Sequence, residues 1–288
     1  MSKIQRGSGW SIRLVYNLYN LFGYKFIYYL MYPVTFFYFI FASNVRVALK
    51  DYYKHINKPF NNKVYFHHLR HFAICMCDRF ISKVALHSYS FEYEDYDRFY
   101  DALEKGGVLA MSHYGGWATA GNCFRQYPIS IVMQEVMLEE IKQIEDEISQ
   151  NNTNENLKII DLSKDQIGAT IQIANALMDN ELVAMMSDRT TIQKHYKTIE
   201  FFDGLANFNK NPFEIAYKTE QTVIAIFVIY KSSQFYRIES IEINMDKSKD
   251  EDEEVRNAMQ IYANKFAQVV EKNPEQWFNF YNFWEEGK

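Results

Sequence analysis

From about residue 100, the hydrophobic and polar positions of the chain alternate between two patterns. Short apolar runs bounded by polar residues are typical of strands, and they occur at Val108–Ser112, Leu157–Leu162, Leu182–Ser187 and Thr222–Tyr230, with further ones at Ile199–Phe202 and Phe235–Ile243. Longer stretches with helical periodicity lie between them, at 135–149, 165–179, 211–219 and 251–272. Strands that alternate with helices predict an α/β fold in which helices cover a central sheet.

The N-terminal region has a different pattern, dominated by aromatic and aliphatic residues. Phe26 to Val45 is a run of twenty uncharged residues, and the part that ends at Phe41 contains nine aromatics, of which four are Tyr. One helix of this length reaches across the roughly 30 Å hydrocarbon core of a bilayer. Pro33, near the middle of the run, and the tyrosines favour instead a kinked helix that lies in the membrane interface. The sequence leaves both alternatives open, beside the third one of a buried core helix.

The charge of this region also favours membrane contact. Residues 1–70 carry ten basic residues and the single acid Asp51, so their net charge is +9 and the remainder of the chain carries −5 − 9 = −14. Basic residues that follow the apolar run predict contact with an anionic cytoplasmic leaflet; they are Arg46, Lys50, Lys54 and Lys58. We expect no nucleic-acid partner, because a nucleic-acid-binding arm does not carry such a dense apolar run.

We therefore expect a single large domain that is preceded by an attachment segment. Residues 1–58 form a membrane-attachment segment, either one helix or a helix pair, since the apolar residues between Trp10 and Phe22 are interspersed with Arg13 and Asn17 and predict an amphipathic helix before the main run. Residues 59–288 form the domain that carries the chemistry.

Composition and cysteine content narrow the class of protein. A hydrophobic fraction of 48% with 17% aromatics excludes a disordered chain. The three cysteines, Cys75, Cys77 and Cys123, are too few for a disulfide framework and fit a reducing compartment. His67, His71 and Cys75 recur every four residues, but no fourth ligand is indicated, so we expect no metal site. Neither a phosphate-binding loop nor a dinucleotide-binding glycine pattern occurs, and we expect no cofactor.

The stretch from Gly106 to Asn122 carries the best candidate for chemistry. An apolar strand ends close to His113, two glycines follow at Gly115 and Gly116, and a helix is predicted to begin near Trp117. Ligands of open α/β sheets bind at the carboxyl ends of the strands. The glycines allow close approach of the backbone, and N–H groups at the start of a helix suit an oxyanion. His113 is thus a candidate general base, although this pattern taken alone favours a structural histidine.

This stretch resembles the first motif of the bacterial lipid A late acyltransferases, within the lysophospholipid acyltransferase superfamily. That motif is a histidine, four further residues, and then Asp or Glu. Later blocks resemble the family in the same order, over residues 10 to 284; they are Ser187–Arg189, Ile199–Ala206, Asn211–Ala216, Thr222–Phe227 and Pro274–Phe278. The resemblance implies a glycerolipid acyltransferase-like fold with a mixed central sheet covered by helices.

The resemblance also implies an activity and a location. The activity is transfer of a fatty acyl group from an acyl carrier protein or acyl-CoA thioester to a hydroxyl of a lipid A precursor or related glycolipid. The location is the inner membrane, with the catalytic domain on its cytoplasmic side. His113 is the implied base, and the residues implied for the oxyanion region or for substrate contact are Gly115, Gly116, Trp117, Asp188, Arg189, Asn211 and Glu214.

The chain departs from the family pattern at two places. Ala118 stands where the acid of the first motif is expected. Either Asp188 or Glu214 reaches His113 in the fold, or His113 works without a partner, or the chain is a catalytically impaired relative that binds lipid. Gln134 and Glu135 stand where a more basic block is expected, which leaves Arg189 as the best cationic substrate contact. A phospholipid or aminolipid acceptor is a further alternative.

Overall fold

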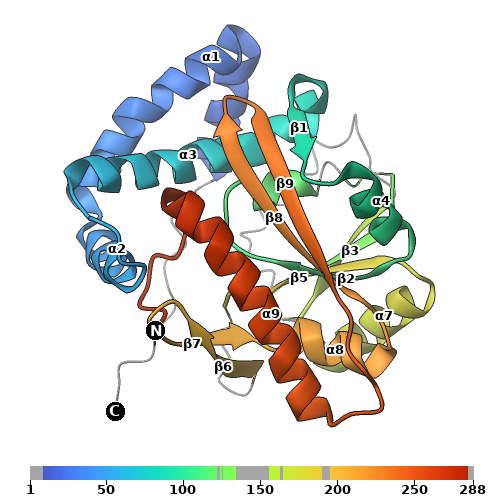
Figure 1. Cartoon of the computed structure of the whole chain (residues 1–288). Coiled ribbons are helices and arrows are strands. Elements are labelled where there is room, and N and C mark those ends of the chain that lie inside the picture. The colour runs from blue at the N-terminus through green and yellow to red at the C-terminus, as the bar shows by residue number, and fades with distance from the viewer. Residues whose placement is uncertain are drawn as a thin grey trace.

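A mixed sheet forms the centre of the computed structural model, which describes residues 9–121, 124, 126–133, 156–162, 165–189 and 195–284 (Figure 1). Seven strands lie in the order β1 (Ser90–Tyr93), β9 (Phe235–Ile243), β8 (Val223–Ser232), β2 (Gly107–Met111), β5 (Leu182–Met186), β3 (Ile129–Met133) and β4 (Leu157–Asp161). Neighbours are parallel except for β8 and β9, which form an antiparallel pair. A separate antiparallel pair consists of β6 (Tyr196–Phe201) and β7 (Gly204–Asn209). The predicted α/β fold with a mixed sheet is confirmed.

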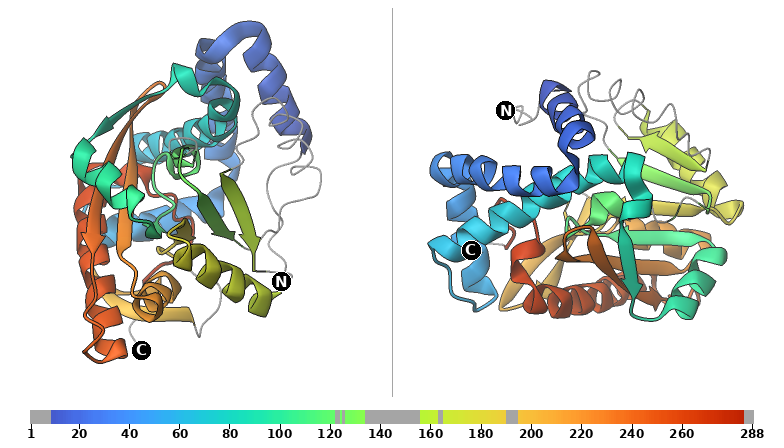
Figure 2. Two further views of the ribbon diagram at one scale, coloured as in Figure 1. Left: turned by 90° about the vertical axis from the view of Figure 1, so that its right-hand side faces the viewer. Right: turned by 90° about the horizontal axis from the view of Figure 1, so that it is seen from above.

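Helices cover both faces of this sheet (Figure 2). They are α1 (Gly9–Phe41), α2 (Ser43–His55), α3 (Asn62–Ala85), α4 (Tyr96–Glu104), α5 (Trp117–Ala120), α7 (Gln166–Met178), α8 (Asn211–Thr219) and α9 (Glu251–Lys272), with short 3₁₀ turns η1 (Leu86–Ser88) and η3 (Pro274–Gln276). One hydrophobic cluster joins α2, α7, α8 and α9 to the sheet, and a second joins α1, α3 and α4 to its other face.

Strand β2 shows why the central strands are apolar along their whole length. Val108 and Ala110 belong to the first cluster, whereas Leu109 and Met111 belong to the second. Successive side chains of a strand point to opposite faces, so a strand covered on both sides needs an apolar residue at every position. The continuous apolar run of the sequence thus reflects burial on both faces.

The N-terminal helices gather at one end of the molecule (Figure 1). Helix α1 is interrupted at Gly23, whose φ of 75° and ψ of −178° are not helical, and it continues through Pro33. Ile27 and Met31 of α1 are buried against α3, and the guanidinium of Arg70 on α3 lies 4.4 Å from the ring centroid of Tyr28. The opposite side of α1 is exposed and rich in large apolar residues.

Within the described residues, no single helix combines the length and apolar content needed to cross a bilayer. The stretch Ile12–Phe41 and helix α2 meet those criteria only as a pair, and the two are bent by 88° relative to each other. The predicted helix 135–149, Cys123 and the Gln134–Glu135 departure lie outside the described residues.

Candidate functional site

Two parallel strands bring His113 and Asp188 together at the carboxyl edge of the sheet. Strands β2 and β5 are neighbours, and Met111 of β2 is in register with Met186 of β5. The register continues beyond the strands, because the N–H of Ser187 donates to the carbonyl of Met111 at 2.7 Å. His113 and Asp188 each follow the last strand residue by two positions, so the same register places them side by side.

His113 and Asp188 form a hydrogen-bonded pair. Nδ1 of the imidazole lies 2.8 Å from Oδ1 of Asp188, and the backbone N–H of His113 donates to Oδ2 at 3.0 Å. A third donor, the indole N–H of Trp277, reaches Oδ2 at 3.1 Å. The Asp188 side chain is 2% exposed and that of His113 is 18% exposed. The acid is therefore enclosed, while the imidazole reaches the surface.

The electrostatic environment keeps Asp188 ionised. Burial by itself raises the pKa of this carboxyl, but the charge and hydrogen bond of His113, the charge of Arg189 and the hydrogen bond from Trp277 outweigh burial and lower the pKa to about 2. A carboxylate that accepts the Nδ1 proton leaves Nε2 as the unprotonated nitrogen of a neutral imidazole. The pair is thus arranged for proton transfer at Nε2.

Gly115 and Gly116 allow the loop after His113 to lie directly on β8. Gly115 has a φ of +52°, and a Cβ atom there would lie 2.0 Å from the carbonyl oxygen of Val228. A Cβ atom on Gly116 would lie 2.4 Å from the ring of Tyr236. Their N–H groups donate to the carbonyls of Gln276 and Val228, both at 2.8 Å. That these glycines shape the oxyanion region stays a prediction. In that role they allow the backbone of the loop to lie close to β8.

Helix α5 contains Trp117 and Ala118, the position at which the family motif has an acid. The ring of Trp117 lies 5.5 Å from that of His113 and 5.7 Å from that of Phe278, so it forms one wall beside the imidazole. Ala118 offers no carboxylate. Of the two acids that the sequence offered in its place, Asp188 contacts Nδ1 of His113, and Glu214 instead accepts a hydrogen bond from Lys210 Nζ at 2.7 Å.

Comparison with known proteins places the chain in a family. The model of the bacterial lipid A biosynthesis acyltransferase family matches residues 72–286. The chain belongs to this family. The acyltransferase is also similar to the crystal structure of the 1-acyl-sn-glycerophosphate (LPA) acyltransferase PlsC from Thermotoga maritima, at 10% sequence identity and a TM-score of 0.39, covering 83% of this chain and 97% of that one. No curated protein matches the chain.

The other predicted substrate-contact residues of the acyltransferase lie along the chain that follows β5 and β7. The guanidinium of Arg189 lies 5.9 Å from the ring centroid of Tyr281. Asn211, at the start of α8, places its side-chain nitrogen 3.3 Å from Nδ1 of His195. Asn209 ties this group to the end of β5, because its side chain donates to the carbonyl of Met186 at 2.7 Å. Their contact with donor or acceptor stays a prediction.

Sequence reasoning missed the contribution of Trp277. The block Pro274–Phe278 resembles the family, but the separation of 89 positions between Trp277 and Asp188 gives no indication that the two side chains meet. An aromatic residue inside a family block is the only signal that pointed to it.

Of the histidines of α3, His68 is fully buried, His71 is partly buried and His67 is exposed. Within the described part of the chain, no three His, Cys, Asp or Glu residues are arranged to hold a metal ion. Burial and the neighbouring His71 lower the pKa of His68 to about 3. Burial, followed by His67 and Arg70, lowers the pKa of His71 to about 4. Protonation of either ring is therefore coupled to unfolding.

This coupling predicts acid sensitivity. In the unfolded chain, both histidines bind a proton below pH about 6.5. In the folded chain, they bind one only below pH about 3 to 4, so the free energy of unfolding falls as the pH drops through this interval. Buried Asp78, whose pKa burial raises to about 6, opposes the trend because the folded state binds its proton first. His68→Gln is expected to reduce the slope of unfolding free energy against pH by up to about 1.4 kcal/mol per pH unit between pH 6 and 4. Urea unfolding at several pH values measures this slope, and an unchanged slope contradicts the assignment.

Proposed function

We propose that this acyltransferase moves a fatty acyl group from an acyl carrier protein or acyl-CoA thioester to a hydroxyl of a lipid A precursor or related glycolipid, with His113 as the general base. The observation that carries the proposal is the pairing of His113 with Asp188 at the carboxyl edge of the sheet, 2.8 Å apart. A base beside an enclosed, ionised carboxylate is the arrangement that activates a hydroxyl nucleophile.

The reaction needs no covalent intermediate on the protein. Nε2 of His113 takes the proton of the acceptor hydroxyl as its oxygen attacks the thioester carbonyl carbon. Asp188 stabilises the imidazolium that forms, because its carboxylate contacts Nδ1. The tetrahedral intermediate then collapses, the C–S bond breaks, and the imidazolium returns the proton to the departing thiolate. The products are an ester and a free thiol.

Ala118 favoured a second candidate, a catalytically impaired relative that binds lipid without turnover. The position of Asp188 weakens that candidate, since the imidazole has a carboxylate partner from another strand. A phospholipid or aminolipid acceptor remains compatible with the same machinery, because the pair acts on a hydroxyl or amine without regard to the rest of the acceptor.

An assay with purified protein tests the proposal. The protein is incubated in detergent with a lipid A precursor and either acyl carrier protein thioester or acyl-CoA, and the lipid is analysed by mass spectrometry. We expect one acyl group to be added to the acceptor. An equal amount of free thiol is released from the donor, and none is released when the acceptor is left out. Retained lipid binding without transfer from either donor supports the impaired relative. Transfer only to a phospholipid or amine changes the acceptor class.

We also propose that α1 and α2 attach the protein to the cytoplasmic leaflet of the inner membrane. Large apolar side chains are exposed along α1 and the start of α2; they are Tyr29, Tyr32, Val34, Phe36, Phe37, Tyr38, Ile40, Phe41 and Val47. Exposed Arg46, Lys50 and Lys54 follow directly on α2. Apolar side chains flanked by basic ones suit an interface with anionic lipid.

Removing two rings from this surface tests the attachment. Phe37 and Phe41 are 57% and 66% exposed. The double variant Phe37→Ser, Phe41→Ser is expected to weaken binding to phosphatidylethanolamine–phosphatidylglycerol vesicles on the order of 10-fold for each ring. The control is Ile167→Ser with Ile171→Ser on α7, where both residues are also exposed. Vesicle flotation measures binding, and an equal loss in both double variants contradicts attachment through α1.

A further inference from the structure

The backbone of residues 276–278 both accepts a hydrogen bond from the loop after His113 and donates one to it. The N–H of Gly115 donates to the carbonyl of Gln276 at 2.8 Å, and the N–H of Phe278 donates to the carbonyl of His113 at 2.9 Å. The side-chain amide of Gln276 exchanges two further hydrogen bonds with the backbone of Tyr230 on β8, both at 2.8 Å. Trp277 lies between these anchors, so its backbone has a fixed position relative to the imidazole.

The indole N–H of Trp277 completes the hydrogen bonding of Asp188. Oδ1 of the carboxylate faces the His113 ring, while Oδ2 accepts from both the His113 backbone and Trp277. Rotation of the carboxylate about its Cβ–Cγ bond therefore breaks two hydrogen bonds on Oδ2. Without the indole donor, a single backbone N–H holds Oδ2, and this buried charged oxygen loses half of its partners.

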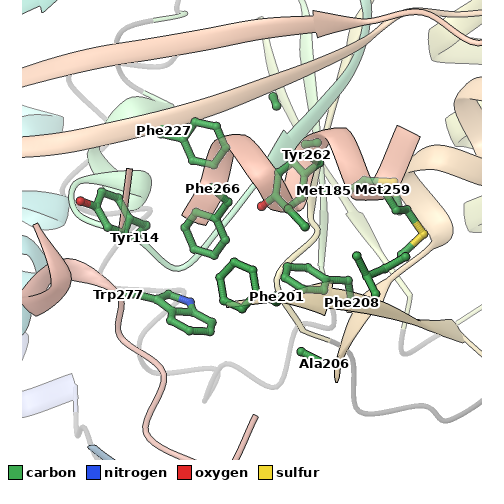
Figure 3. Packing of buried hydrophobic residues seen from close by; sticks show 14 of the residues in the cluster. Tyr114, Met185, Phe201, Ala206, Phe208, Phe227, Met259, Tyr262, Phe266 and Trp277 are labelled. Atoms are coloured by element: carbon green, nitrogen blue, oxygen red, sulfur yellow. The ribbon is translucent and has the colours of Figure 1, made fainter. Parts of the chain in front are cut away.

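Trp277 is itself held by aromatic packing and by α3. It is fully buried, with its ring 5.3 Å from that of Phe266 and 5.5 Å from that of Phe201 (Figure 3). Nε2 of buried His68 lies 3.1 Å from its carbonyl oxygen, and Nδ1 of His68 lies 3.3 Å from the hydroxyl of Tyr53 on α2. A neutral histidine offers one donor and one acceptor, which matches these two contacts when Nε2 carries the proton.

We infer that Trp277 is a positioning residue, whose indole N–H holds the carboxylate of Asp188 in the orientation that keeps His113 ready to accept a proton, with His68 of α3 holding Trp277 in turn. The inference rests on the proposed function for its effect on turnover. The orienting acid of the first family motif is absent at Ala118, so the partner of His113 comes from another strand. An acid supplied by a separate strand needs an anchor of its own, and the indole provides it.

A matched pair of tryptophan variants tests this role. Trp284 lies in the same aromatic cluster, its ring 6.0 Å from that of Trp277, and its indole N–H donates to the carbonyl of Phe201 at 2.9 Å instead of to Asp188. Trp277→Phe is expected to lower kcat about 10- to 100-fold with little change in KM, the range set by one hydrogen bond to a charged group. Trp284→Phe removes the same groups from the same core and is expected to stay within about threefold of the wild type.

A spectroscopic readout separates positioning from general loss of structure. In substrate-free protein with ¹⁵N-labelled histidine, the ring resonances of His113, assigned by their loss in His113→Gln, are expected to shift in Trp277→Phe and to stay in place in Trp284→Phe. If Trp277→Phe does not fold, replacement of its indole by benzothiophene at the same position keeps the shape of the ring system and exchanges the N–H donor for a sulfur atom. Equal losses of kcat in the two variants, or unmoved His113 resonances, overturn the inference. Failure of the wild type to form an ester overturns the proposed function instead, and the resonances still report on Asp188 and Trp277.

Discussion

His113→Ala is expected to lower the rate of ester formation on the order of 10⁴-fold while the protein stays folded. A positioned general base contributes up to about this factor, and His113 is the only imidazole that contacts Asp188 in the described residues. Its side chain is partly exposed, and Asp188 keeps the hydrogen bonds from the backbone N–H of residue 113 and from Trp277 after the ring is removed. The measurement is initial velocity with saturating thioester donor, together with thermal unfolding of the variant.

His55 offers a matched control for this variant. It also forms a histidine–carboxylate pair, with Nδ1 2.6 Å from Oδ1 of Asp203, but it lies on α2 and stacks on Trp284. We expect His55→Ala to retain turnover within about threefold. A His113→Ala protein that keeps more than a tenth of the wild-type rate contradicts the assignment of the base.

Asp188→Asn is expected to produce the second largest loss, about 10²- to 10⁴-fold, by fixing the wrong tautomer of His113. Oδ2 accepts two N–H groups, so the amide oxygen of Asn must take that position and its NH₂ group must face Nδ1. An NH₂ donor at Nδ1 moves the ring proton to Nε2, where the nitrogen no longer accepts a proton from a hydroxyl. In the Ser-His-Asp triad the corresponding change costs about 10⁴ in kcat.

The control for this variant is Asp203→Asn, which changes the other histidine–carboxylate pair in the same way. The side chain of Asp203 is largely exposed, so we expect little change in the free energy of unfolding or in turnover. If Asp188→Asn and Asp203→Asn have the same rate, the carboxylate at 188 has no part in the chemistry.

The strands beside the site were predictable because their burial leaves a continuous apolar pattern. The predicted runs at Val108–Ser112 and Leu182–Ser187 are β2 and β5, and they placed His113 and Asp188 at strand exits. Choosing Asp188 over Glu214 as the partner required the order of strands in the sheet. That order depends on which strands pair across long connections, and no local pattern in the chain records it.

Other elements lacked a local pattern strong enough to predict. Strand β7 (Gly204–Asn209) mixes polar and apolar residues and is defined by its pairing with β6. Strand β3 (Ile129–Met133) is a short run whose apolar residues are interrupted by the polar Ser130. The break of α1 at Gly23 lies between the amphipathic helix predicted up to Phe22 and the apolar run predicted from Phe26, so the pattern separated the two parts without giving the position of the break.

The site also depends on contacts that the spacing of residues along the sequence does not reveal. The sequence reached the imidazole and offered the acid, but the third member of the arrangement, Trp277, arrives from the end of the chain through backbone pairing with Tyr114. Such pairing depends on the packing of η3 against α3 and on the burial of Trp277 among aromatic residues from α2, β6 and α9. It is a consequence of the complete fold.

The rate of ester formation by the double variant His113→Ala, Asp188→Asn tests most directly whether His113, paired with Asp188, is the base. A carboxylate that acts only through the imidazole has nothing to orient once the ring is gone, so the double variant is predicted to be no more than a few-fold slower than His113→Ala alone. A rate lowered by the product of the two single losses would contradict the account.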